Sequence, residues 1–288
     1  MPQHVLILGP TGRFGRHASQ AFTDAGWRVS HFNRARDDLM QAARGVDVIV
    51  NGWNPPYDKW QSDLPGQTRE IIDTARRHGA TVLFPGNVYV YGKGSPELLA
   101  PDTPHRARNP LGRLRIEMEA AYRASGVPTI VLRAGDFIDT EASGNWFDRV
   151  IVGKLDRGVF TYLGPMNVPH AWAFLPDLGR AAVALAEMRG HLARFQEVSY
   201  PGFTLTGEDL AQALERALGR TLARRRFSYL PIRLAAPFWP LGRHLAEMRY
   251  LWAMPHRLDR KTFAELLPNF TETPLEQALL AASGQGQG

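Results

Sequence analysis

A run of four aliphatic residues followed by three spaced glycines constrains the fold of this 288-residue chain more than any other feature. Val5 to Leu8 is predicted to be a strand buried on both faces, as in a parallel sheet. The residues from Arg16 to Asp24 place apolar side chains at helical spacing, so Gly9, Gly12 and Gly15 mark the turn from a strand into a helix. Backbone amides and the positive end of a helix dipole bind a pyrophosphate at such a turn. The pattern therefore predicts a dinucleotide site.

The following residues repeat the alternation of strand and helix. Strands are predicted at 27–32, 46–52, 81–84, 127–133, 170–174 and 197–202, and helices at 38–44, 67–79, 111–125 and 177–188. This repeat predicts an α/β fold with a Rossmann-type, doubly wound parallel sheet. The few residues between Arg34 and Leu39 leave no room for the usual third strand. We expect that edge strand to be missing or very short.

The end of the second strand indicates which dinucleotide is bound. In dinucleotide-binding folds a carboxylate there binds the adenosine 2′-hydroxyl, whereas an arginine suits a 2′-phosphate. Asn33 stands in place of an acid, followed by Arg34 and Arg36, and Arg13 is available from the glycine loop. A guanidinium is permanently charged and pairs well with phosphate. We expect NADP(H) rather than NAD(H); the alternative is that these arginines are only solvated surface side chains.

The segment from Asn51 to Tyr57 follows the next strand, at the edge where ligands bind in open α/β sheets. Its aromatic residues, Trp53 and Tyr57, have two interpretations. They either stack on nicotinamide or substrate, or cover the backbone of their own loop.

Composition argues against several other functions. The chain has no cysteine, which excludes disulfides, thiolate metal sites and a cysteine nucleophile. Its histidines do not follow a metal-ligand spacing, so we expect no metal. The net charge of +6 comes mostly from dispersed arginines, so we expect no nucleic-acid partner. No apolar run has membrane-spanning length and the first residues do not form a secretion signal, so we expect a cytoplasmic protein with no membrane partner.

Several motifs resemble those of the extended and atypical short-chain dehydrogenase/reductase superfamily, which includes NAD-dependent epimerase/dehydratase-like proteins. They are the glycine loop, Val90-Tyr91-Gly92, Leu132-Arg133-Ala134-Gly135-Asp136, the segment 174–181, and the closing segments 266–270 and 273–276. The resemblance covers nearly the whole chain. It implies an NADP-binding Rossmann domain at 1–139, with 170–200 returning to it, and a smaller mixed C-terminal substrate cap at 140–169 and 201–288. Within that cap, 283–288 is predicted to be disordered.

The resemblance breaks at the catalytic positions. Active members carry a Ser or Thr before the Val-Tyr-Gly motif, then a Tyr and, four residues later, a Lys; these orient the substrate oxygen, exchange its proton and bind the nicotinamide ribose. The register places Asn87, Leu111 and Arg115 at those positions. Leucine cannot exchange a proton and arginine is not a base at neutral pH, although Asn87 can still stabilise an oxyanion. The candidates for a substitute acid are Tyr57, Tyr89, Tyr91 and His170.

Three functions stay open: an NADP(H)-dependent oxidoreductase acting on a small or medium apolar carbonyl or enone, a non-catalytic NADP(H)-binding sensor or regulator, and a sugar-nucleotide epimerase-like enzyme. The predicted catalytic residues are Asn87, Tyr91 and Arg115. The predicted cofactor-binding residues are Gly9, Thr11, Gly12, Arg13, Phe14, Gly15, Asn33, Arg34, Asn51, Gly52, Trp53, Asn87 and Arg115. The predicted small-molecule substrate contacts Trp53, Tyr57, Tyr89, Trp146, His170 and Trp172. By analogy with relatives, helices 67–79 and 111–125 are expected to pair in a homodimer.

Overall fold

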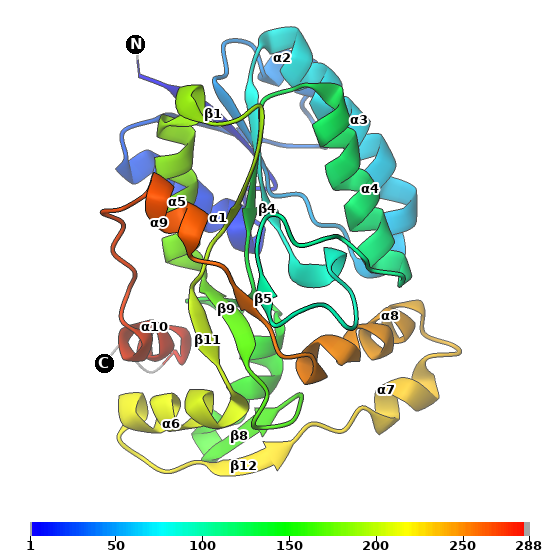
Figure 1. Ribbon diagram of the computed structural model, residues 1–288, viewed down its shortest axis with the longest axis vertical. Coiled ribbons are helices and arrows are strands. Elements are labelled where there is room, and N and C mark those ends of the chain that lie inside the picture. The colour runs from blue at the N-terminus through cyan, green and yellow to red at the C-terminus, as the bar shows by residue number, and fades with distance from the viewer. Residues whose placement is uncertain (1, 285–288) are drawn as a thin grey trace.

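The computed structural model describes residues 2–284 and places a parallel sheet between two layers of helices, above a smaller mixed region (Figure 1). The strands are β1 His4–Leu8, β2 Arg28–Phe32, β3 Val48–Asn51, β4 Thr81–Gly86, β5 Leu98–Leu99, β6 Thr129–Arg133, β7 Asp136–Ile138, β8 Val159–Tyr162, β9 His170–Phe174, β10 Phe195–Ser199, β11 Phe203–Leu205, β12 Ala223–Arg226 and β13 Arg257–Leu258. The helices are α1 Arg13–Asp24, α2 Leu39–Ala42, α3 Trp60–His78, α4 Pro110–Ser125, α5 Leu175–Glu187, α6 Gly207–Leu218, α7 Leu230–Ala235, α8 Pro240–Met248, α9 Lys261–Leu266 and α10 Leu275–Ala282.

The main sheet has the strand order β10-β6-β4-β3-β1-β2, and all of its strand pairs are parallel. Within residues 2–284, no strand lies between Phe32 and Val48, so the expected loss of the third strand is confirmed and β2 forms the edge. The chain leaves β1 toward β2 on one side and later builds β3 on the other. This reversal creates a crevice at the carboxyl ends of β1 and β3, where ligands bind in such sheets.

The first strand explains the two helical layers. Because side chains alternate across a strand, Val5 and Ile7 join the core under α1, α5 and α9, while Leu6 and Leu8 join the core under α3 and α4. The buried faces of these helices show the spacing expected of amphipathic segments, with Ile71, Ile72 and Ala75 buried on α3. The Rossmann-type, doubly wound architecture predicted from the sequence is therefore confirmed.

Two elements depart most from the sequence-based prediction, one in where it begins and one in the sheet that it joins. Helix α3 begins at Trp60, seven residues before Gln67, although Pro65 lies inside it. Trp60 and Leu64 are buried in the core, and their packing outweighs the hydrogen bond that Pro65 cannot donate. Strand β9 has its predicted bounds, but it pairs with β7 and β11 in a separate three-stranded sheet rather than entering the main sheet.

The region below the main sheet has its own hydrophobic core. Phe160, Tyr162, Trp172 and Trp252 are buried in it, together with the inner faces of α6 and α10. The C-terminal part is not confined to this region, because Phe263 of α9 packs in the core of the main sheet. Of the segment predicted to be disordered, 283–284 form a turn and 285–288 lie outside the described residues. Among residues 2–284, no helix has both the length and the apolar character needed to cross a bilayer.

Candidate functional site

The glycine loop has the close contacts that a dinucleotide turn needs. Gly9 has a φ of +72°, and a Cβ there would lie 3.1 Å from the carbonyl oxygen of Gly52. A Cβ on Gly15 would lie 2.1 Å from the carbonyl oxygen of Gly9, so only glycine lets α1 pack against the loop. The N-cap residue of α1 is Gly12, and its first turn contains no acidic residue and no side-chain cap. The amides of this turn therefore suit an external anion such as a phosphate.

Other predicted loop residues divide between core and surface. Phe14 is buried in the core, whereas Thr11 is exposed. The Nε of Arg13 donates to the carbonyl oxygen of Ser143, 3.1 Å away, which links the loop to the segment after β7. Asn51 has a local structural role, because its Oδ1 accepts from the amide of Trp53.

The end of β2 presents a guanidinium and no free carboxylate. The Arg34 guanidinium lies 4.5 Å above the Trp53 ring, which itself packs against Phe32. Asp37 is the nearest following acid, and its carboxylate accepts from the backbone N–H of Asn33. Trp53 is 9% exposed, adjoins the glycine loop at Gly9 and lies beneath Arg34.

The position expected to hold the catalytic tyrosine lies in the core. Leu111 is 1% exposed and packs among the side chains between α4 and the sheet. One turn later, Arg115 is 7% exposed and its guanidinium lies 4.3 Å over the Trp60 ring. Its Nη2 donates to Asn54 Oδ1 at 2.8 Å, and its Nε is buried without a partner. No carboxylate forms an ion pair with Arg115 within the described residues, and burial lowers the pKa of its guanidinium.

Two tyrosines predicted to contact substrate form a pair at the carboxyl edge of the sheet. Tyr57 follows β3 and Tyr89 follows β4, and their hydroxyl oxygens are 2.7 Å apart. Burial raises the pKa of Tyr57 and raises that of Tyr89 well above its ordinary value, so both hydroxyls are protonated at neutral pH. Asn87 lies directly before this pair, where its Oδ1 accepts from the amide of Tyr89 and its Nδ2 remains a donor.

A histidine and an aspartate connect this edge to the lower region. Asp136 begins β7, and one of its carboxylate oxygens lies 2.7 Å from Nε2 of His170 on β9. The His170 ring stacks on Trp252 with centroids 4.4 Å apart, and the His256 ring is 4.5 Å away. Trp146 and Trp172 also pack against Trp252. Trp252, which sequence analysis did not select, thus contacts three predicted substrate residues: Trp146, His170 and Trp172.

A cavity of about 380 Å³ lies on the other side of Trp252. It is lined by Arg226, Arg233 and Arg249 together with Phe227 and Tyr229. These three arginines have no carboxylate partner within residues 2–284. The structure leaves several buried polar atoms around this aromatic cluster without a hydrogen-bond partner: Tyr162 Oη, His170 Nδ1, Trp172 Nε1, Tyr229 Oη and His256 Nε2. Of these residues only Tyr229 lines the cavity, so its wall carries one buried hydroxyl without a partner together with three arginines, which suits a polar or anionic ligand.

The predicted catalytic residue Tyr91 belongs to a different, closed network. It is fully buried, and its hydroxyl lies 3.4 Å from Glu197 Oε1. Arg133 donates to that same oxygen at 2.6 Å and to Glu119 at 2.7 Å. Although burial alone would lower it, the two carboxylates hold the pKa of Arg133 well above its ordinary value. This placement is that of a structural residue rather than a proton donor to substrate.

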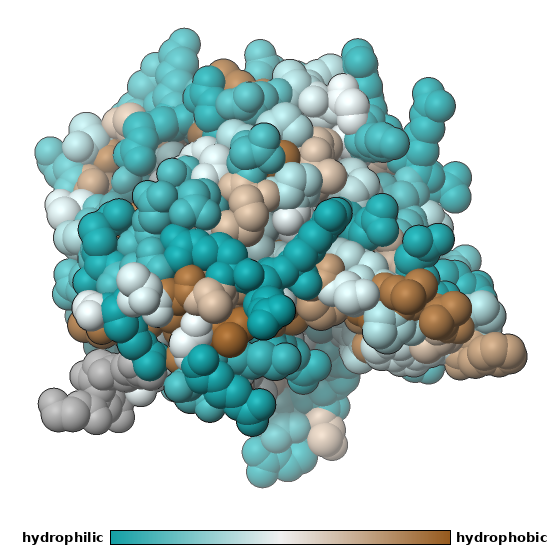
Figure 2. Space-filling model, turned by 90° about the horizontal axis from the view of Figure 1, so that it is seen from below, coloured by the Kyte–Doolittle hydropathy of each residue, from teal (hydrophilic) through white to brown (hydrophobic). Residues whose placement is uncertain are grey.

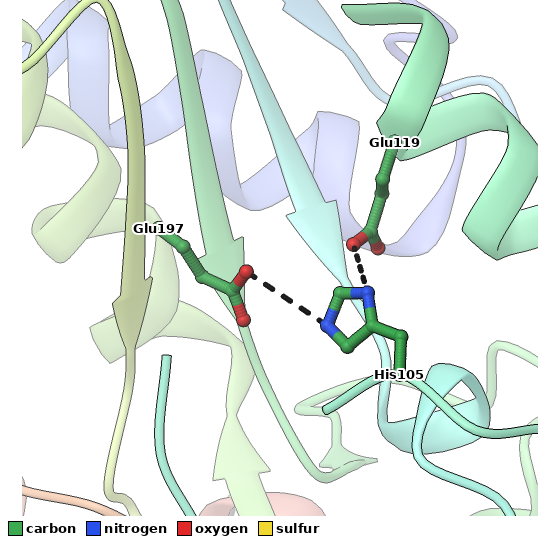
Figure 3. A group of neighbouring side chains, drawn as sticks. All are labelled: His105, Glu119 and Glu197. Atoms are coloured by element: carbon green, nitrogen blue, oxygen red, sulfur yellow. Dashed lines mark ion pairs between the residues drawn. The ribbon is translucent and has the colours of Figure 1, made fainter. Parts of the chain in front are cut away.

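The same network contains the one group of metal-ligand side chains found among the described residues. His105 lies between Glu119 and Glu197, with ligand atoms of all three within 4.8 Å of one another (Figure 3). Arg133 already donates to both carboxylates, and its charge opposes a bound cation. Burial, followed by the effect of Arg133, lowers the pKa of His105, so the imidazole is neutral. We interpret the cluster as a buried ion network, which no local sequence spacing indicates.

Comparison with solved structures shows the fold. A GalE-like L-threonine dehydrogenase from Cupriavidus necator superposes with a TM-score of 0.77 at 15% identity, covering 100% of both chains. A UDP-glucuronic acid 4-epimerase from Bacillus cereus, solved with UDP-glucuronic acid and NAD, gives 0.76 at 14% identity and 98% coverage of both. A nucleoside-diphosphate-sugar epimerase from Pseudomonas aeruginosa gives 0.71 at 18% identity, covering 97% of this chain and 96% of that one. No known family and no curated protein matches the sequence.

The chain therefore has the fold of these epimerases and of this dehydrogenase. The motif-based resemblance predicted this fold correctly. Sequence analysis missed Asp136, Trp60, Trp252 and the cavity arginines. Asp136 was within reach, because it follows a predicted strand at the same edge as the glycine loop; Trp252 and the arginines lie in segments with no local motif.

Proposed function

We propose that this protein is an NADP(H)-dependent oxidoreductase that acts without the tyrosine–lysine pair usual for its fold. The observation that carries the proposal is the meeting of Gly9 with Gly52 at the reversal point of the sheet, beside an α1 N-terminus that has no side-chain cap. The bound dinucleotide would supply or accept the hydride at the substrate carbon. Residues of the glycine loop would hold its phosphates, and Arg115 its nicotinamide-side ribose.

The preference for the phosphorylated dinucleotide rests on Arg34. Its guanidinium is held over Trp53 at the end of β2, and no carboxylate follows that strand directly. A 2′-phosphate would find a planar cation there, whereas a 2′-hydroxyl would find no acceptor. Arg36 is exposed in the following turn and offers a matched control position.

The tyrosine pair takes over the proton transfer in this proposal. Tyr57 and Tyr89 are neutral and hydrogen-bonded to each other, so the pair can give one proton to a substrate oxygen during reduction. The Nδ2 of Asn87 can donate to the same oxygen and stabilise its developing charge. Asp136 holds His170 against Trp252, which lines the cavity, and acts as a positioning residue.

The cavity supports a substrate that combines a carbonyl with an acidic group. Phe227, Tyr229 and Trp252, none of which the sequence analysis selected, provide aromatic walls for an apolar body. Arg226, Arg233 and Arg249 add positive charge without carboxylate partners, which suits a carboxylate or phosphate on the substrate. We therefore extend the expected apolar carbonyl or enone to one that carries an anionic substituent.

Nucleotide titration followed by a turnover assay tests the proposal. NADPH and NADH are titrated against the wild type and against Arg34→Glu and Arg36→Glu. We expect tighter binding of NADPH, a loss of about tenfold in Arg34→Glu and little change in Arg36→Glu. Consumption of NADPH is then followed with acidic and neutral carbonyls, and Tyr57→Phe or Tyr89→Phe should lower kcat. Binding of neither dinucleotide would refute the proposal, and a preference for NADH would refute its NADP(H) part.

Two other functions have specific support. Burial of Leu111 at the usual tyrosine position favours a non-catalytic NADP(H) sensor or regulator, which would bind NADPH without turning over any carbonyl. The three cavity arginines favour a sugar-nucleotide epimerase-like enzyme, since similar folds were solved with UDP-glucose or UDP-glucuronic acid. Binding of UDP-glucose to the wild type, measured by calorimetry and abolished in Arg249→Met, would favour the epimerase-like function.

A further inference from the structure

The segment that links β12 to α8 exposes an unusual group of apolar side chains. Of the seven large hydrophobic residues that are exposed among the described residues, four lie here: Leu230 at 59%, Leu234 at 70%, Phe238 at 92% and Trp239 at 40%. Figure 1 shows α7 at the margin of the molecule, away from the main sheet. Figure 2, the view from below, shows a brown protrusion on that same side. Single exposed leucines are ordinary, but a contiguous apolar protrusion marks an interaction surface.

The local structure fixes this protrusion in shape. Leu230 and Leu234 are one helical turn apart on α7, so they share a face, and no residue of α7 is buried. Ile232, on another side of the helix, packs against the lower core. After α7 the amide of Phe238 donates to the carbonyl oxygen of Ala235, which forms a turn between two prolines. The apolar side chains therefore point outward from an anchored support.

The segment that carries the apolar group is also rich in positive charge, and Arg226, Arg233 and Arg249 share a cavity wall with Leu230. Residues 223–249 contain six arginines and a single acid, Glu247, so this segment carries a formal +5 of the chain's total of +6. Arg224 is paired with Glu208 and Glu215. The other five are exposed and form no ion pair with a carboxylate anywhere in 2–284: Arg225, Arg226, Arg233, Arg243 and Arg249. The charges that the remaining chain carries nearly cancel, so the molecule is strongly asymmetric.

Charge and shape together select the partner. A second copy of this chain would bring two segments of formal +5 face to face, which electrostatic repulsion disfavours. A nucleic acid would neutralise the arginines but leave Phe238 and Leu234 in water. An anionic bilayer satisfies both features, because its headgroup phosphates attract guanidinium groups and its interfacial layer accepts Trp, Phe and Leu.

We propose that segment 225–249 is a membrane-docking surface for bilayers rich in anionic phospholipids. Leu234, Phe238 and Trp239 insert into the interfacial layer, and Arg225 and Arg243, which do not line the cavity, contact headgroup phosphates. Arg226, Arg233 and Arg249 add to the positive charge that attracts an anionic surface. The protein then lies on the membrane without crossing it, so the proposal departs from the sequence-based expectation of no membrane partner, which considered only spanning segments. It does not depend on the proposed redox function.

Vesicle co-sedimentation tests the proposal with the full chain. We expect the wild type to bind vesicles of equal parts phosphatidylcholine and phosphatidylglycerol, to bind pure phosphatidylcholine weakly, and to be released as ionic strength rises from about 0.1 M to about 1 M. Phe238→Asp should lower the partition coefficient about tenfold or more, since it removes the phenyl group that would insert into the bilayer and adds a negative charge. The control is Met40→Asp on α2, an exposed apolar side chain outside the docking surface, which should bind like the wild type.

The absence of cysteine permits a direct measure of insertion. An environment-sensitive fluorophore on Phe238→Cys should shift to the blue with anionic vesicles, whereas the same label on Met40→Cys should not. Light scattering without vesicles tests whether the segment binds a second copy of the chain, and addition of a single-stranded oligonucleotide tests whether it binds nucleic acid. The proposal is wrong if the wild type does not bind anionic vesicles or if Phe238→Asp binds them as well as the wild type. It is also wrong if the label at 238 shifts without vesicles while light scattering shows a doubling of mass, because the segment then binds a second copy of the chain. A shift only with the oligonucleotide would likewise contradict the proposal.

Discussion

Two buried arginines, Arg133 and Arg115, differ in whether carboxylates of the chain pair with their guanidinium groups. Arg133 donates to Glu197, Glu119 and the carbonyl oxygen of Asn87, so its charge is satisfied inside the chain. Arg115 has only a neutral amide, a thioether and an aromatic ring as partners, and its Nε has none. A buried charge that is fully paired holds the fold together. Arg115 forms no ion pair within the described residues, so its donors are available to the ribose and phosphates of a dinucleotide.

Removing the paired arginine is expected to have the largest effect. Arg133→Met leaves two buried glutamates without their cation and should lower the free energy of unfolding by about 3–5 kcal/mol. Urea unfolding of the variant measures this loss. Adding Glu119→Gln and Glu197→Gln to the variant should restore part of it, because the uncompensated charges are then gone. A loss below about 1 kcal/mol would show that Arg133 is not the centre of a structural network.

A buried imidazole extends the comparison to acid pH. Burial, with His170 beside it, lowers the pKa of His256 from 6.5 to about 3. Between these values the unfolded chain binds a proton that the folded chain does not, so stability is lost as the pH falls through this window. The loss attributable to His256 should reach about 2 kcal/mol near pH 5.

Urea unfolding of His256→Gln over the same pH range measures this contribution. The variant should lose less stability on acidification than the wild type. His31→Gln, at an exposed position on β2, provides the control and should follow the wild type. Parallel curves for the wild type and His256→Gln would contradict the prediction.

Replacing the unpaired arginine should separate stability from binding. Arg115→Met preserves much of the side-chain volume and removes a desolvated charge, so the free energy of unfolding should stay within about 1 kcal/mol of the wild type or rise. Affinity for NADPH should fall about tenfold. Titration and urea unfolding are compared with those of Arg113→Met, which replaces an exposed arginine on the same helix. A large loss of stability without any loss of affinity would mean that Arg115, like Arg133, has a structural role and does not bind the dinucleotide.

An exposed ion pair is expected to contribute least. Arg216 and Glu276 lie 3.0 Å apart between α6 and α10, but both side chains are about half exposed. Water and salt screen such a pair, so Arg216→Ala should change the free energy of unfolding by less than about 1 kcal/mol. A larger loss in urea unfolding would mean that this contact fixes the packing of α10 on α6.

Local signals predicted much of the half that contains the main sheet. Gly9, Gly12 and Gly15 followed a buried strand and preceded a helix, and the structure places them in that turn. The missing third strand followed from the short interval after Arg34. The start of α3 could not be predicted in the same way, because Pro65 is locally unfavourable and only the burial of Trp60 and Leu64 compensates for it.

The candidate site was predicted unevenly. Tyr57 and Tyr89 were both selected, but their contact joins loops after different strands and no local pattern contains it. Tyr91, from the same motif as Tyr89, turned inward to Glu197 because the buried ions around Arg133 occupy that side of the loop. Trp252 was missed because its contacts with His170, Trp146 and Trp172 come from distant parts of the chain.

By itself, the sequence determined the glycine turn after β1, the parallel sheet and the leucine at position 111, because each depends on residues that are neighbours along the chain. Only the tertiary structure decided which charges are satisfied and which are not. Arg133, Arg115 and the arginines of 225–249 are the same residue type with the same charge. Their partners are set by packing between segments that are far apart in sequence. Because burial removes water from the charge, those partners decide whether an arginine stabilises the fold or stays available to a ligand.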